Sequence, residues 1–195
     1  MIKILKIFFR FSKNLIFKID SNVGDGFNRE TLLNQIFDDD ENKLSRANKI
    51  DLSGNLIAKI DDDTFKHLSQ LESLDLSQNR LACLNSNLFS SLTNLQRIDL
   101  HSNQIKWLDS NAFRFLVKLK YLNLDNNHLS ALHSNTFGSL INLNELWLQS
   151  NRLDLIESNT FTNIRNAKFL LIYLGGNPFK FSDRIICGKS QTCEF

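Results

Sequence analysis

The stretch LQRIDLHSNQIKWLDSNAFRFLVK (residues 95–118) repeats its pattern when it is shifted by 24 residues along the chain in either direction. Its asparagine, Asn103, recurs in the other units, with the last copy two residues late: Asn55, Asn79, Asn127, Asn151 and Asn177. Its phenylalanine, Phe113, recurs with the same period: Phe65, Phe89, Phe137 and Phe161. A period kept this long indicates a stacked repeat architecture, in which each unit buries its apolar face against its neighbours.

Seven apolar positions accompany the asparagine in each unit, and in residues 95–118 they are Leu95, Ile98, Leu100, Ile105, Leu108, Phe113 and Leu116. Ile98 and Leu100 alternate with polar residues. This alternation predicts a short strand with its apolar side chains inward and Asp99 outward. One such strand is too short to be stable alone, so the neighbouring units must supply its hydrogen-bond partners.

The repeat register divides the 195 residues into four parts. Residues 1–28 are a basic amphipathic segment followed by a linker, and residues 29–46 are a degenerate first repeat. Residues 47–179 are leucine-rich repeats in full register, and residues 180–195 are a tail or a vestigial cap. A degenerate end unit is expected because a terminal repeat has one face in water.

The N-terminal segment has two competing interpretations. On a helix its lysines and arginine would share one face and its apolar residues another, which would allow residues 1–18 to lie on a membrane surface. The favoured alternatives are a cap that packs on the first repeat and a mis-assigned start of the gene. The lysines and the arginine interrupt every apolar stretch of this segment, so it lacks the apolar core of a signal peptide. No uncharged apolar run in the sequence reaches the roughly 18 residues of a transmembrane helix.

The pattern LxxLxLxxNxLxxLxxxxFxxL closely resembles the leucine-rich repeat family, in particular the 24-residue class of Toll-like receptor ectodomains, Slit-type proteins and small leucine-rich proteoglycans. The resemblance covers about residues 31–179. It implies an α/β-type solenoid, namely a right-handed arc with a concave parallel β-sheet and a mostly irregular or short helical convex side. The asparagines should then satisfy buried backbone groups, and the phenylalanines should stack on the far side of the core.

The outward positions of the predicted strands form the surface where a ligand could bind. Neighbouring strands lie about 4.8 Å apart, so residues in equivalent positions form columns across the repeats. Large aromatic side chains gather on three consecutive strands of an otherwise polar face, a composition typical of protein-binding hot spots. The candidate ligand-binding residues are Arg97, His101, Tyr121, Asp125, Glu145, Trp147 and Tyr173. The aspartates Asp51, Asp75 and Asp99 are interpreted as solvated filler, because exposed carboxylates are routine.

These features favour a non-catalytic module that binds a protein ligand of unknown identity. The sequence has no glycine-rich phosphate loop and no nucleophile elbow, so we expect neither catalysis nor a cofactor. The four histidines lack metal-ligand spacing, so no metal site is expected either. A net charge of +2 gives no electrostatic argument for nucleic acid.

The cysteines and asparagines bear on where the protein resides. The resemblance implies an extracellular or receptor-type protein, and GGNPF (residues 175–179) is similar to the entry of the family's C-terminal cap. The usual cap cysteines are replaced by Phe181 and Asp183, so only Cys187 and Cys193 are left for one small disulfide loop. None of the 24 asparagines begins an N-x-S/T glycosylation acceptor. An intracellular, cytoplasmic scaffold or adaptor therefore stays open as the alternative.

Overall fold

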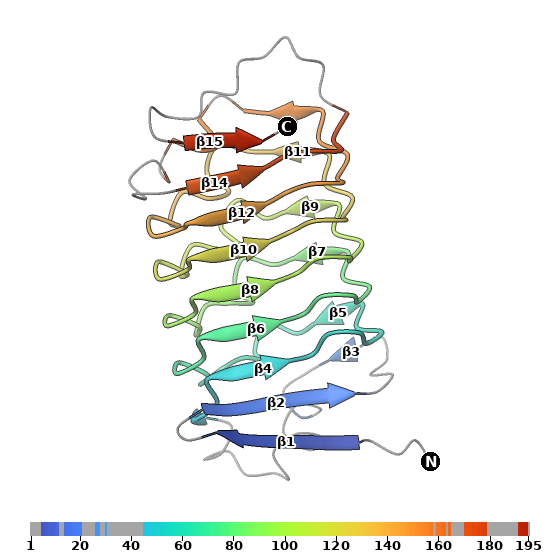
Figure 1. The fold of residues 1–195 in the computed structure, drawn as a ribbon, viewed down its shortest axis with the longest axis vertical. Coiled ribbons are helices and arrows are strands. Elements are labelled where there is room, and N and C mark those ends of the chain that lie inside the picture. The colour runs from blue at the N-terminus through green and yellow to red at the C-terminus, as the bar shows by residue number, and fades with distance from the viewer. Residues whose placement is uncertain are drawn as a thin grey trace.

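The structure is a computed structural model, and it describes residues 5–11, 14–20, 26–27, 30, 45–157, 159–162, 164, 170–178 and 191–194. Each 24-residue unit forms one coil of a solenoid, and the coils stack along the long axis of the molecule (Figure 1). The solenoid with a concave parallel sheet that the repeat pattern implied is therefore confirmed.

One strand from each coil joins a nine-stranded sheet (Figure 1). All its neighbouring strands are parallel except the first pair, which is antiparallel. In spatial order the strands are β1 (Leu5–Phe11), β2 (Asn14–Asp20), β4 (Lys49–Asp51), β6 (Ser73–Asp75), β8 (Arg97–Asp99), β10 (Tyr121–Asn123), β12 (Glu145–Trp147), β14 (Leu170–Tyr173) and β15 (Gln191–Glu194).

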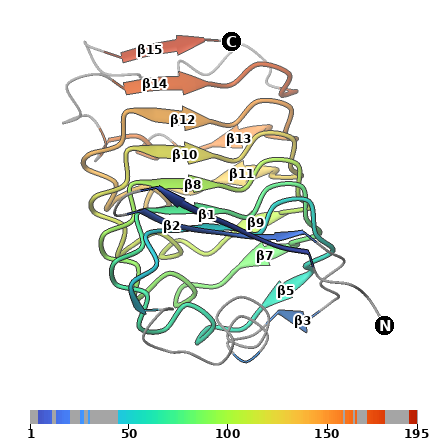
Figure 2. The same ribbon diagram turned by 60° about the horizontal axis from the view of Figure 1, so that its bottom comes forward.

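Short strands on another side of the coils form three further two-stranded parallel ladders (Figure 2). All of them except β3 follow an asparagine turn, at a place where the sequence pattern predicts no strand. The pairs are β3 (Gly26–Phe27) with β5 (Lys59–Ile60), β7 (Cys83–Leu84) with β9 (Trp107–Leu108), and β11 (Ala131–Leu132) with β13 (Leu155–Ile156).

The apolar repeat positions form one continuous core between the large sheet and the opposite wall. In the third coil Ile98, Leu100 and Ile105 are completely buried. The phenylalanines stack on the far side of the core, with ring centroids 6.1 to 6.4 Å apart from Phe65 to Phe161. Both the inward strand alternation and the aromatic stack match the sequence prediction.

The asparagines tie each coil to the one before it. Asn103 Nδ2 donates to the carbonyl oxygens of Leu76 (2.9 Å) and Leu100 (3.0 Å), and its Oδ1 accepts a hydrogen bond from Leu81 N (3.0 Å). Asn177 makes the equivalent three bonds although it comes two residues late in the sequence. The ladder thus satisfies backbone groups that leave the strands inside the core, as predicted.

The residue before each asparagine has a left-handed backbone. Six coils share this conformation, with φ between 52° and 73°, at Gly54, Gln78, Ser102, Asn126, Ser150 and Gly176. Five of these residues also donate their N–H to a carbonyl of the next coil; for Ser102 the acceptor is Asp125 O at 2.9 Å. The turn therefore continues the hydrogen-bonded stack beyond the end of the strand.

The ends of the chain extend the sheet. Residues 5–11 and 14–20 are paired strands and not the helix considered for the N-terminal segment, and β2 adds in parallel to β4. Two residues of the expected linker, Gly26 and Phe27, pair with β5. At the other end β15 adds in parallel to β14. The degenerate repeat lies mostly outside the described residues, and the four-part division of the chain stays a prediction.

Candidate functional site

The outward residues of β8, β10, β12 and β14 define what we call the recognition face. Parallel pairing in register places Arg97, Tyr121, Glu145 and Leu171 in one column, and Asp99, Asn123, Trp147 and Tyr173 in the next. A column of buried side chains lies between these two columns, because successive side chains of a strand point to opposite sides of the sheet. His101 and Asp125 follow the ends of β8 and β10. All seven predicted residues therefore lie on the same side of one sheet.

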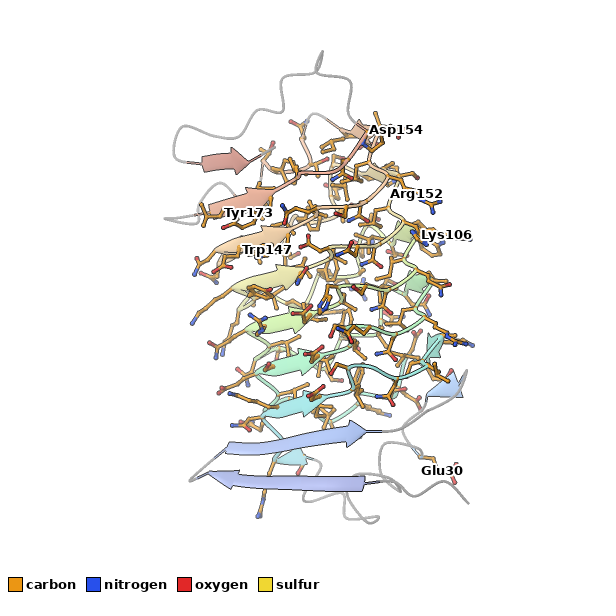
Figure 3. The ribbon with its side chains drawn as sticks, turned by 45° about the vertical axis from the view of Figure 1, so that its right-hand side comes forward. Glu30, Lys106, Trp147, Arg152, Asp154 and Tyr173 are labelled. Carbon is orange, nitrogen blue, oxygen red and sulfur yellow. The ribbon has the colours of Figure 1, made fainter. Side chains whose placement is uncertain are left out.

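Three aromatic side chains on this face form what we call the aromatic column, which takes Tyr121 from the first of these two columns and Trp147 and Tyr173 from the second. Trp147 and Tyr173 stack with ring centroids 4.0 Å apart and an interplanar angle of 25°. Tyr121 is 6.5 Å from Trp147 and tilted by 42°. Figure 3 shows Trp147 and Tyr173 on neighbouring strands, away from Lys106, Arg152 and Asp154 at the other edge. The rings are half-buried because they cover one another.

Arg97 lies at the N-terminal end of the aromatic column. Its guanidinium carbon is 3.5 Å from the centroid of the Tyr121 ring, and its Nη2 is 3.2 Å from Asp99 Oδ2. Burial raises the pKa of Tyr121 above its ordinary value, and the Asp99 carboxylate adds to that rise. Tyr121 is therefore a neutral phenol at physiological pH. Its oxygen also accepts a hydrogen bond from Asn123 Nδ2 (3.3 Å).

Asp99 is buried, which corrects its interpretation as solvated filler. Its Oδ1 lies 2.8 Å from His101 Nδ1 and accepts a hydrogen bond from His101 N (3.2 Å). Asp51, Asp75 and Asn123 occupy the same place in their repeats, and each accepts a hydrogen bond from the backbone N–H two residues on. A short side chain with an acceptor oxygen suits this Asx turn. The aspartate column therefore has a structural role.

Two carboxylates sit beside the aromatic column. Glu145 Oε2 accepts a hydrogen bond from Trp147 Nε1 (3.2 Å), which orients the indole on the face. Asp125 Oδ1 accepts one from Gln149 N (2.7 Å). Burial raises the pKa of Asp125 above its ordinary value, while the Gln149 hydrogen bond and the field of His101 oppose that rise. These hydrogen bonds hold the Glu145 carboxylate against Trp147 of the same strand and the Asp125 carboxylate against Gln149 of the next coil.

Other sequence predictions fall partly outside the described residues. Cys187 is not among them, so its disulfide with Cys193 stays a prediction. Cys83 is an exposed free thiol on β7. Within the described part of the chain, no three histidine, cysteine, aspartate or glutamate residues converge as metal ligands, and no helix is long and apolar enough to cross a membrane.

The sequence model of the family described as "Leucine rich repeat" matches residues 45–105, 83–129 and 117–179. These matches cover more than half of the chain. The chain belongs to the leucine-rich repeat family. This membership accounts for the 24-residue period, the asparagine ladder and the parallel sheet.

Two solved structures show where similar leucine-rich repeats occur. The structure of TLR13 in complex with ssRNA13 is similar with a TM-score of 0.72 and 28% identity, over 85% of this chain and 22% of that one. A chain of the Toll–Spatzle complex of Drosophila is similar with a TM-score of 0.52 and 20% identity, over 73% of this chain and 25% of that one.

This leucine-rich repeat chain thus spans a quarter or less of the chains it matches. At 20% identity the likeness to the Toll–Spatzle chain concerns the fold alone. No curated protein sequence matches the chain.

Proposed function

We propose that this leucine-rich repeat chain is a non-catalytic recognition module that holds a protein ligand on its concave face. The observation that carries the proposal is the aromatic column of Tyr121, Trp147 and Tyr173, set among Arg97, His101, Asp125 and Glu145. Stacked aromatic rings present apolar area with little loss of side-chain freedom on binding. Clusters of this composition account for most of the binding energy in protein interfaces.

The charge of the face favours protein over nucleic acid. The outward positions from β4 to β14 include the carboxylates Asp51, Asp75, Asp99, Asp125 and Glu145, but only two permanent cations, Lys49 and Arg97. A phosphate backbone needs a concentration of lysine and arginine. TLR13 is complexed with an RNA in the similar structure. For this chain, the excess of carboxylates leads us to propose a protein ligand and no nucleic acid.

Trp147→Ala tests the proposal, with Trp107→Ala as the matched control. Trp147 belongs to the aromatic column, whereas Trp107 is 53% exposed on β9, away from the large sheet. We expect Trp147→Ala to weaken binding of a copurifying protein partner by about 2 kcal/mol or more, roughly thirtyfold in Kd. Trp107→Ala should leave the affinity unchanged.

Isothermal titration with the identified partner measures both affinities, and circular dichroism checks that both variants fold. Equal affinity of wild type and Trp147→Ala would contradict the assignment of the concave face. So would a loss confined to Trp107→Ala.

For localisation we propose an extracellular or cell-surface setting, which the similarity to TLR13 at 28% identity suggests. The alternative is an intracellular scaffold or adaptor that uses the same face, and it is favoured by the missing glycosylation acceptors and the exposed thiol of Cys83. Alkylation of native protein followed by mass spectrometry separates them. One alkylated thiol indicates a Cys187–Cys193 disulfide and the extracellular setting, and three indicate the intracellular one.

A further inference from the structure

Arg97 shows how this face holds a guanidinium group. Arg97 lies 3.5 Å from the centroid of the Tyr121 ring and 3.2 Å from the Asp99 carboxylate. A guanidinium is planar and weakly hydrated, so it stacks on an aromatic face while its edge pairs with a carboxylate. The two contacts therefore do not compete. The arrangement needs one aromatic ring and one carboxylate, here Tyr121 on β10 and Asp99 on β8.

The strand β12 carries both an aromatic ring and a carboxylate, Trp147 and Glu145, and it contains no lysine or arginine. Trp147 stacks on Tyr173 with ring centroids 4.0 Å apart. Glu145 lies beside the indole, and its Oε2 accepts a hydrogen bond from Trp147 Nε1. Within the described residues, Glu145 makes no salt bridge. Its second carboxylate oxygen, Oε1, is the natural acceptor for a further donor.

The charge distribution along the face points to the same kind of partner. The two permanent cations, Lys49 and Arg97, lie on β4 and β8. The outward positions of β10, β12 and β14 and of the turns that follow them include Asp125 and Glu145 but no lysine or arginine. The aromatic half of the face is therefore net acidic. An acidic aromatic surface complements a basic side chain.

We propose that the protein ligand presents an arginine whose guanidinium stacks on Trp147 and pairs with Glu145. This inference rests on the proposed function, because it names the chemistry of the partner at the same face. The ligand residue would make the same two kinds of contact that Arg97 makes with Tyr121 and Asp99, with the ring and the carboxylate here on one strand, β12. Lysine fits the site less well, because an ammonium is a compact, strongly hydrated point charge that cannot stack.

A tetra-arginine peptide and a tetra-lysine peptide of the same length are the probes. In a Trp107→Phe background Trp147 is the only tryptophan, so its fluorescence reports binding at the site directly. We expect tetra-arginine to bind about fivefold more tightly than tetra-lysine. Glu145→Gln should weaken tetra-arginine binding by about three- to tenfold, and the glutamine keeps an acceptor for Trp147 Nε1.

Asp75→Asn is the matched control, because it removes the same charge from the same face. Its amide oxygen can still accept the hydrogen bond from Ser77 N. β6 and β12 are three strand spacings apart, about 14 Å, which exceeds the Debye length of about 8 Å at physiological salt. Asp75→Asn should therefore leave the affinity for tetra-arginine unchanged.

Equal binding of the two peptides, no effect of Glu145→Gln, or equal effects of Glu145→Gln and Asp75→Asn would each overturn the arginine site. If the peptides fail in this way while Trp147→Ala still abolishes capture of the copurifying partner, the proposed function stands without the arginine. If the peptides behave as expected while the partner binds Trp147→Ala normally, the face binds guanidinium groups but the partner does not use it, and both the proposed function and the arginine of the ligand are wrong.

Discussion

At the scale of single residues, the polar side chains of this protein divide by what they contact rather than by type. Asn103 is buried and bonded to four backbone groups of two coils. Asn111, in the same coil, is exposed. Likewise Asp99 is buried under Arg97 and His101. The position in the repeat predicted the role of Asn103, whereas the burial of Asp99 depends on side chains that are particular to its coil.

Asn103→Ala should lower the free energy of unfolding by about 3 kcal/mol or more. The substitution leaves Leu81 N and the carbonyls of Leu76 and Leu100 without their side-chain partner inside the core, and each unsatisfied buried group costs about 1 to 3 kcal/mol. Asn111→Ala, the control, should change stability by less than about 0.5 kcal/mol. Urea denaturation measures both. Similar losses for the two variants would contradict the special role of the buried asparagine.

Asp125→Asn should make the protein more stable at neutral pH. Burial raises the pKa of Asp125 in the folded state. A folded state that binds the proton more tightly than the unfolded chain loses stability as pH rises through the interval between the two pKa values. Asparagine keeps the acceptor for Gln149 N and has no charge to bury.

The stability gain of Asp125→Asn should shrink as pH falls and vanish below the unfolded-state pKa of about 3.9, because both side chains are then neutral. Urea midpoints measured between pH 3 and pH 8 test this. A stability gain that grows as pH falls would contradict the raised pKa of Asp125 in the folded state.

At the scale of elements, each coil is held to the next by three parallel systems. These are the strand of the large sheet, the asparagine turn and the phenylalanine stack, of which the Phe89–Phe113 pair with centroids 6.2 Å apart is an example. The left-handed residue in the turn was not visible in the sequence, since glycine occupies it only at Gly54 and Gly176. At Ser102 the hydrogen bond to the next coil supports the conformation instead. Turn residues alone could not predict it, because the support comes from 23 residues further along the chain.

Phe113→Ala should lower the free energy of unfolding by roughly 3 to 5 kcal/mol. Its ring is fully buried between Phe89 and Phe137, so the truncation opens a cavity shared by three coils. Phe115→Ala is the matched control in the same coil. Phe115 is only half-buried and lies under Arg114, so its loss should cost about 1 kcal/mol. Thermal unfolding followed by circular dichroism compares them, and equal losses would mean that the aromatic stack adds nothing beyond local packing.

At the scale of the whole molecule, stacking turns a one-dimensional period into a two-dimensional surface. Tyr121, Trp147 and Tyr173 follow one another at intervals of 26 residues, yet they become neighbours because their strands pair in register. The same stacking places Lys49 and Arg97 on β4 and β8, toward one end of the face, and leaves its aromatic half acidic. The chain ends extend the sheet through β1, β2 and β15, where the repeat pattern indicates no strand.

The 24-residue period by itself determined the solenoid, the inward side chains, the asparagine ladder and the side of the sheet on which Arg97, Tyr121, Trp147 and Tyr173 lie. These features follow from spacing, because every coil must bury the same positions against its neighbours. The spacing of strands also predicts that Trp147 and Tyr173 touch, but only the tertiary structure decided the angle at which their rings stack, that Arg97 lies over Tyr121 and that Asp99 is buried. Those contacts depend on side-chain directions and on the distance between coils, and neither is encoded in the position of a residue within its repeat.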